Sequence, residues 1–165
     1  MYEKLKGKTL LVMDRTSLAA CAVIRAKEMG IKTVVANFYK YEDSPSKQVA
    51  DVAIDADISD IDLMLDIIKE HNIDGIFVGW TDSHLPFYAE NSKKAGLPCC
   101  GTVEQFDILS NDKRRFKEIC AEYGVPTPEA FNIDINFKRE DLDKIVYPVM
   151  VKPADGSGGR GIMKC

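Results

Sequence analysis

Residues 147–165 read YPVMVKPADGSGGRGIMKC, and the organisation of the chain is clearest from this stretch. The apolar run 149–151 predicts a strand that delivers Lys152 to the edge of a glycine-rich loop. Glycines at this density let a backbone approach a ligand closely, and their N–H groups can bind phosphate oxygens. The candidate residues of the loop are Gly156, Ser157, Gly158, Gly159 and Gly161. Because residues 162–163 predict a returning strand, the stretch indicates a glycine-tipped hairpin with a cation at its base.

This hairpin has two interpretations. A flexible hairpin that binds nothing explains the glycines as well as a phosphate site does. Lys152 favours the phosphate site, because side chains alternate along a strand and Lys152 then shares a face with Met150, which suits a base ring beside phosphates. The loop is not a P-loop, since Gly159-Arg160-Gly161 precedes a strand and not a helix. It is closer to the glycine flap over ATP in protein kinases.

Upstream of residue 102, apolar runs alternate with helical patterns. The predicted strands are 9–13, 33–38, 49–54, 75–80 and 97–101. The predicted helices are 17–29, 61 to about 71, which Asp57, Ser59 or Asp60 could cap, and 85–95. Residues 39–47 are expected to form a loop. The first helix, capped by Ser17, has Leu18, Cys21, Ala22, Ile24 and Arg25 at helical spacing. This alternation predicts an α/β fold with a doubly wound, Rossmann-like parallel sheet.

The turn after the first strand argues against a dinucleotide cofactor. It reads Asp14-Arg15-Thr16-Ser17 and contains no glycine. A nicotinamide or flavin site requires glycines there, so that the pyrophosphate can reach the helix N-terminus. The sequence therefore predicts the fold without the cofactor.

The pattern changes after residue 102. A short helix is predicted at 103–109 and a longer one at 113–123, which Ser110, Asn111 or Asp112 could cap. Gly124 and two following prolines end the longer helix, and a further helix is expected at 137–144. We therefore expect two domains, 1–110 and 111–165.

The start of the longer helix is the second basic element. Lys113, Arg114 and Arg115 follow Asp112 directly. A capped, solvated helix start is one explanation, but cations at a helix N-terminus oppose the helix dipole. A bound polyphosphate would use both the cations and the N-terminus.

Composition excludes several classes of protein. The 165 residues are 45% hydrophobic and 29% charged, with a net charge of −4 that is spread along the chain. Disorder is therefore excluded, and nucleic acid is not an expected partner. No apolar run is long enough for a membrane span and no signal-peptide core is present, so we expect a cytoplasmic protein. The five cysteines lack a C-x-x-C spacing, and we expect them to be reduced and mostly buried.

Taken in order, these motifs resemble the ATP-grasp enzymes over all 165 residues, in particular biotin carboxylases and the large chain of carbamoyl-phosphate synthases. By this resemblance Lys113 and Lys152 are the two cations that contact the nucleotide phosphates, and Gly156 to Gly161 form the flap. The sequence AEYGVPTP at 121–128 also looks like the family's. Arg114 and Arg115 point to the synthase-like branch, whereas the first turn lacks the glycines of many relatives.

The resemblance implies a pre-ATP-grasp domain at 1–110, followed by the truncated start of an ATP-grasp lobe at 111–165. The parent enzyme would use Mg²⁺ and ATP to convert a carboxylate or bicarbonate into an acyl phosphate, which an amine or ammonia attacks. In the family the magnesium ligands and the catalytic arginine lie after the flap. The chain is thus expected to be a fragment or one product of a split gene, and inactive alone.

Two expectations concern partners. The hairpin would expose strand edges, so a homodimer or swapped contact through the region after Asp134 is expected. Substrate could be selected at the carboxyl edge of the sheet, where Asp14, Arg15, Trp80, Thr81 and Asp82 are either pocket residues or ordinary loop residues. The alternative to an enzyme is a non-catalytic α/β binding or interaction module.

Overall fold

The chain forms two compact units, Met1–Asp107 and Ile108–Cys165, in a computed structural model that describes residues 2–155 and 159–165. The first unit contains β1 (Thr9–Val12), α1 (Ser17–Glu28), β2 (Lys32–Asn37), α2 (Pro45–Val49), β3 (Val52–Asp55), α3 (Ile61–Glu70), β4 (Gly75–Phe77), α4 (Leu85–Ala95) and α5 (Val103–Phe106). Short 3-10 turns lie at Glu3–Leu5, Tyr41–Asp43 and Asp82–His84, and a π turn lies at Asp107–Asn111. The second unit contains α6 (Lys113–Glu122), a 3-10 turn (Arg139–Lys144), β5 (Met150–Val151) and β6 (Met163–Lys164).

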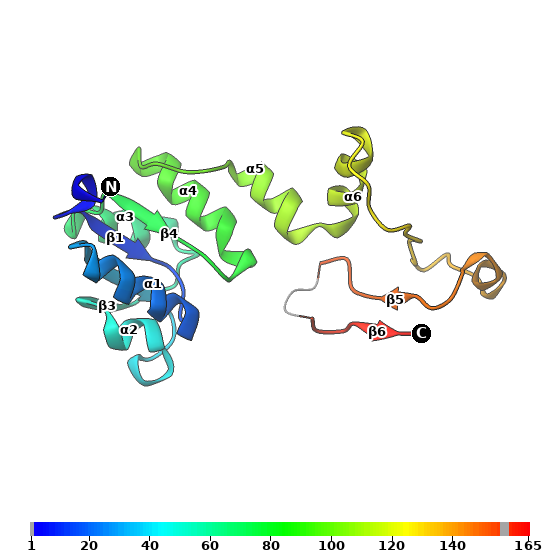
Figure 1. The fold of residues 1–165 in the computed structure, drawn as a ribbon, viewed down its shortest axis with the longest axis horizontal. Helices are drawn as coiled ribbons and strands as arrows, with labels where there is room; N and C mark the ends of the chain where they lie inside the picture. The colour runs from blue at the N-terminus through cyan, green and yellow to red at the C-terminus, as the bar shows by residue number, and fades with distance from the viewer. Residues whose placement is uncertain (1, 156–158) are drawn as a thin grey trace. The chain divides into compact units, whose positions relative to one another are not determined.

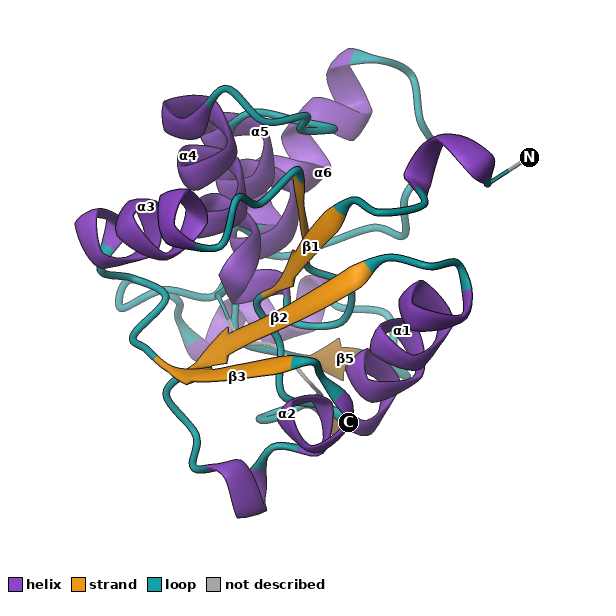
Figure 2. Cartoon of the chain, turned by 90° about the vertical axis from the view of Figure 1, so that its left-hand side faces the viewer, coloured by secondary structure: helices purple, strands orange, loops and turns teal. Residues whose placement is uncertain are grey.

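The first unit is built on a parallel sheet with strand order β3-β2-β1-β4. Figure 2 shows α1 and α2 on one side of this sheet and α3 and α4 on the other. The predicted α/β class and doubly wound sheet are therefore confirmed.

Each face of the sheet has its own core. Leu11 and Met13 pack toward the side that carries Met64 of α3, whereas Val12 packs with Ala19 and Val23 of α1. All six side chains are fully buried. This follows from the period of two along a strand, which sends neighbouring side chains to opposite faces.

The buried face of α1 differs from the predicted one. Leu18 and Ile24 are half-exposed, while Ala19, Val23 and Ala26 face the sheet. Small residues let the helix approach the sheet closely, so the larger side chains turn outward. The N-cap was also predicted one residue too late, because the side chain of Thr16 accepts the bond from the Ala19 N–H.

Residues 97–101 do not form the predicted fifth strand. The Leu97 N–H bonds to the Ser92 carbonyl of α4, and the Cys100 N–H bonds to the Tyr88 hydroxyl. Pro98 has no N–H to offer to a sheet. The backbone donors of this segment are therefore used by α4, and the segment remains irregular.

The loop expected at 39–47 contains part of a helix, which also changes the third strand. Pro45 begins α2 at a position where a missing N–H costs nothing. The helix continues to Val49, so β3 starts at Val52, three residues later than predicted.

The cysteines are free, as expected, but the prediction that most are buried was wrong. Cys120 is buried, whereas Cys21, Cys99, Cys100 and Cys165 are exposed. Cys21 lies on the outward face of α1, and the other three lie in irregular segments. Cys21 is exposed because α1 turns a different face toward the sheet, and Cys99 and Cys100 are exposed because residues 97–101 are not a strand of the sheet.

Asp51 ties the start of β3 to β2 and gives a pH prediction. Its carboxylate accepts bonds from the Thr33 N–H (2.9 Å) and hydroxyl (2.8 Å) and pairs with Lys27 (2.9 Å). Burial raises the pKa of Asp51, but the bonds from Lys27 and Thr33 together outweigh burial and lower it. A lowered pKa contributes stability above the unfolded value, about 4, and this contribution is lost as pH falls through the folded value.

We therefore expect Asp51→Asn to reduce the loss of unfolding free energy that accompanies acidification below about pH 4. Urea unfolding at a series of pH values measures this loss. Asp66→Asn, an exposed carboxylate on α3, is the matched control and should leave the pH slope closer to that of the parent. Equal slopes for Asp51→Asn and the parent would contradict the assignment.

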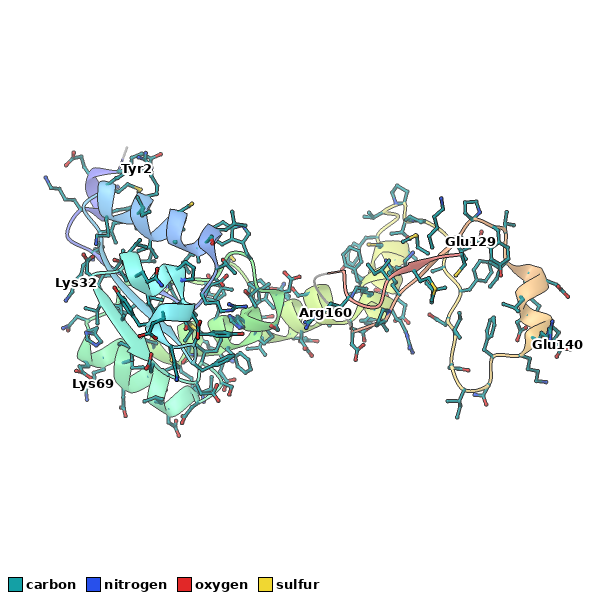
Figure 3. The ribbon with its side chains drawn as sticks, turned by 90° about the horizontal axis from the view of Figure 1, so that it is seen from below. Tyr2, Lys32, Lys69, Glu129, Glu140 and Arg160 are labelled. Atoms are coloured by element: carbon teal, nitrogen blue, oxygen red, sulfur yellow. The ribbon has the colours of Figure 1, made fainter. Side chains whose placement is uncertain are left out.

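In the second unit, Asp112 is the N-cap of α6 and accepts the N–H groups of Arg114 and Arg115. The predicted hairpin is present, with β5 and β6 antiparallel and Met150 opposite Lys164 (Figure 1). The expected helix at 137–144 is a 3-10 turn. Figure 3 labels Glu129, in the irregular segment before this turn, and Glu140, within the turn.

Candidate phosphate site

The start of α6 contacts the hairpin directly. The backbone N–H of Lys113 donates to the Ala154 carbonyl at 3.2 Å, and its Nζ lies 3.4 Å from the same oxygen. Ala154 is two residues past Lys152, at the entry to the glycine loop. The structure therefore brings Lys113 to the segment that begins with Lys152.

Lys152 lies one residue past the end of β5 and is exposed. Across the hairpin, Lys164 pairs with Met150, so these two side chains project from the same face. Sequence reasoning did not identify Lys164, because its position depends on the hairpin register.

The described part of the glycine loop has left-handed backbone. Gly159 has φ +73° and Gly161 has φ +71°. A side chain at Gly161 would also place its Cβ 2.9 Å from the Pro153 ring. Gly156, Ser157 and Gly158 lie outside the described residues. Arg160, between the two described glycines, is exposed (Figure 3).

The glycine geometry gives a prediction with a matched control. Gly161→Ala combines a left-handed φ with a contact on Pro153, whereas Gly159→Ala has the same φ and no atom within 4 Å. We expect Gly159→Ala to cost about 1 kcal/mol and Gly161→Ala to cost more. The readout is amide exchange of Cys165, whose N–H bonds to the Val149 carbonyl across the hairpin at 2.9 Å. Equal exchange in the two variants would show that the Pro153 contact is unimportant.

Charge along α6 is arranged unevenly. Arg115 pairs with Glu118 (3.0 Å) and Glu122 (3.4 Å), and the bond to Glu118 is the main cause that raises its pKa. The bond from the Arg115 N–H is the main cause that lowers the pKa of the capping Asp112. Arg115 is therefore compensated within the helix, so the cations at the helix start are not all available to a ligand.

The second candidate area is the carboxyl edge of the parallel sheet. Asp14 is fully buried, with one carboxylate oxygen bonded to the N–H groups of Arg15 and Thr16 and the other without a partner among the described residues. The guanidinium of Arg15 lies 4.1 Å from the centre of the Tyr39 ring. The Asp14 side chain thus stabilises the turn through hydrogen bonds to its backbone and is not exposed at the surface.

The other residues expected at this edge lie after β4. Trp80 is 45% exposed and meets the Phe77 ring edge-on, and Asp82 is exposed at the start of a 3-10 turn. Thr81 is half-buried. His84 ends that turn, and its Nδ1 lies 2.7 Å from the Met13 carbonyl, so the turn is held to the residue that follows β1.

A buried polar group beside this edge was not predicted. Lys47 of α2 is 1% exposed, and its Nζ bonds to the carbonyls of Asn37 and Tyr39 and to the carboxylate of Asp55. The only sequence signal was Ser44-Pro45, which marks a helix start.

Two absences hold for the residues that the structure describes. Within 2–155 and 159–165, no three His, Cys, Asp or Glu side chains come together as metal ligands. No helix in this part of the chain has the length and apolarity to cross a membrane.

A family model described as "Carbamoyl-phosphate synthase L chain, ATP binding domain" matches residues 112–165. The 2-oxoglutarate carboxylase small subunit of Hydrogenobacter thermophilus is 34% identical over 96% of this chain and 36% of its own length. The carbamoyl phosphate synthase large chain of Clostridium botulinum is 23% identical over 82% of this chain and 13% of its own. The chain thus spans well under half the length of these relatives.

Solved structures with a similar fold are also enzymes of this kind, and the chain again matches only part of each. The biotin carboxylase domain of the H. thermophilus 2-oxoglutarate carboxylase, a dimer in complex with MgADP, ADP and bicarbonate, has a TM-score of 0.72 at 30% identity. The match covers 96% of this chain and 37% of that domain. An N5-carboxyaminoimidazole ribonucleotide synthetase in complex with ADP shares the fold, with a TM-score of 0.74 at 22% identity. The match covers 98% of this chain and 41% of the synthetase chain. The chain belongs to the ATP-grasp superfamily, spans part of the length of these enzymes, and resembles biotin carboxylases and the carbamoyl-phosphate synthase large chain.

Proposed function

We propose that the chain supplies the N-terminal portion of an ATP-grasp ligase, and that this enzyme activates a carboxylate or bicarbonate as an acyl phosphate for attack by an amine or ammonia. In this proposal residues 1–110 form the pre-ATP-grasp domain and residues 111–165 begin the nucleotide-binding lobe. The observation that carries the proposal is the contact of Lys113 with Ala154, because it joins the basic helix start to the glycine loop.

The chain's own residues would bind and orient ATP. Lys113 and Lys152 would neutralise phosphate oxygens, and the loop of Gly156, Ser157, Gly158, Gly159 and Gly161 would cover them with backbone N–H groups and exclude water. A carboxylate oxygen of the substrate would attack the γ-phosphorus, and ADP would leave. The amine would then attack the acyl carbon, and phosphate would leave. We assign no general base to this chain.

When bound, Mg²⁺ would supply positive charge that offsets the negative charge of the phosphates during attack by the carboxylate. Carboxylate ligands suit Mg²⁺, and among the described residues no three His, Cys, Asp or Glu side chains come together as metal ligands. On the strength of the family resemblance, we propose that the magnesium ligands lie after residue 165.

The test of this function is to measure ADP release from ATP by the chain combined with the remainder of an ATP-grasp lobe. That remainder would come from the coding sequence that adjoins residue 165 or from a companion gene. ADP release that requires both the lobe and bicarbonate or a carboxylate supports the proposal. The alternative, a non-catalytic α/β binding module, would release no ADP, whichever of the two sources supplies the remainder of the lobe. Calorimetry with MgATP on the chain alone should show weak or no binding.

We also propose a cytoplasmic protein that forms a homodimer through the region after Asp134. Apolar side chains are highly exposed there, including Ile135 at 99% and Val146 at 82%. Exposed apolar surface and open strand edges favour pairing with a neighbouring chain. Light scattering should report a dimer for the chain alone, and Ile135→Ser with Val146→Ser should shift it toward a monomer. A monomeric parent protein would contradict this surface.

A further inference from the structure

Two adjacent thiols lie next to a buried tyrosine of α4 and are not part of the candidate phosphate site. Cys99 and Cys100 are exposed, free and located in the irregular segment between α4 and α5. Neither thiol takes part in the proposed ATP chemistry.

Tyr88 fixes the position of this pair. Its hydroxyl donates to the Cys100 sulfur at 3.8 Å and accepts the Cys100 N–H at 3.3 Å. The Tyr88 side chain is 8% exposed and its ring lies 5.8 Å from the Phe106 ring, so the hydroxyl is held by the core. The Cys100 sulfur therefore lies beside a donor that the core holds in place, and Cys99 is its neighbour in sequence.

Geometry disfavours a disulfide between these neighbours. Consecutive Cα atoms are about 3.8 Å apart across a trans peptide and about 2.9 Å across a cis one. A relaxed disulfide needs about 4.4–6.8 Å between Cα atoms. A bridging cation does not require the two sulfur atoms to approach to the length of an S–S bond. Two metal–sulfur bonds of about 2.3 Å at a tetrahedral angle place the sulfurs roughly 3.8 Å apart.

We propose that Cys99 and Cys100 form a dithiolate site for a soft d¹⁰ cation such as Zn²⁺ or Cd²⁺, with the Tyr88 hydroxyl as hydrogen-bond donor to a thiolate sulfur. Thiolates select soft cations over Mg²⁺. Binding forms two metal–sulfur bonds and releases the thiol protons to solvent, without oxidation or reduction. Because no third His, Cys, Asp or Glu converges on the pair among the described residues, water or an external ligand would complete the coordination.

The test is titration of the reduced protein with Cd²⁺ alone, read by the ultraviolet charge-transfer absorption of cadmium thiolate. We expect this absorption in the parent, at least about tenfold weaker affinity in Cys99→Ser and in Cys100→Ser, and no absorption in the double variant. The matched control is Cys21→Ser with Cys165→Ser, which removes the other exposed thiols and should keep the absorption. Absence of the band in the parent, its persistence in the Cys99/Cys100 double variant or its loss in the control would overturn the site.

Tyr88→Phe tests the donor, because it keeps the ring and removes the hydroxyl. We expect Cd²⁺ affinity to fall about tenfold while the absorption remains. Unchanged affinity, with far-ultraviolet circular dichroism that shows an intact fold, would remove Tyr88 from the proposed site. None of these measurements depends on ATP, so they succeed or fail independently of the proposed ligase.

Discussion

Lys47→Ala is expected to destabilise the first unit by about 3–6 kcal/mol, the largest single-residue effect on stability that we predict. The Lys47 side chain is fully buried, and its Nζ bonds to the Asn37 carbonyl at 2.9 Å, to the Tyr39 carbonyl and to Asp55. Alanine removes a buried four-carbon stem and leaves a cavity, and it also withdraws the donor from both carbonyls. The Asn37 carbonyl keeps a bond from the Ala56 N–H, so the Tyr39 carbonyl loses most.

A second substitution separates the two causes. Lys47→Met refills the volume but supplies no donor, so we expect a loss of about 1–3 kcal/mol. Asp55→Asn is the control for the ion pair, and it should change stability by no more than about 1 kcal/mol because the Asp55 side chain is 74% exposed. Urea unfolding followed by the fluorescence of Trp80, the single tryptophan, reports on this unit. A larger loss for Asp55→Asn than for Lys47→Met would mean that the ion pair dominates.

The first unit could be predicted largely because its signals are local. After Thr9 the run at β1 is apolar, as a strand covered on both faces requires, and Asp60 caps α3 by accepting the Leu63 N–H. Asp112 in the second unit was among three cap candidates, and the structure selects it. These features depend on a few neighbouring residues, so the sequence alone contains the information.

What could not be predicted depends on contacts between distant residues. Residues 97–101 have the composition of a strand, but the buried Tyr88 hydroxyl and α4 take their N–H groups. The burial of Lys47 depends on carbonyls at Asn37 and Tyr39, and a lysine in a polar loop gives no local sign of it. The Lys113–Ala154 contact joins residues 41 positions apart, so the motifs suggested both ends of the site but not their contact.

Lys152→Ala is expected to weaken ATP binding by about tenfold to a hundredfold in the assembled enzyme of which we propose the chain is the N-terminal part. A charged hydrogen bond to a phosphate contributes about 1.5–3 kcal/mol, and Lys152 is exposed at the end of β5, with no buried role that its removal would disturb. The measurement is calorimetric titration with MgATP, together with the KM for ATP in ADP release.

Lys113→Ala should weaken ATP binding at least as much, because the Lys113 Nζ also contacts the Ala154 carbonyl and its loss would loosen the entry to the glycine loop. Lys144→Ala is the matched control, since Lys144 is an exposed lysine of the same unit that pairs with Asp141 in the 3-10 turn. Equal weakening in all three variants would mean that only net charge matters. Unchanged binding in both Lys113→Ala and Lys152→Ala would remove the phosphate site from the hairpin, because the proposal requires these two cations to act on one triphosphate.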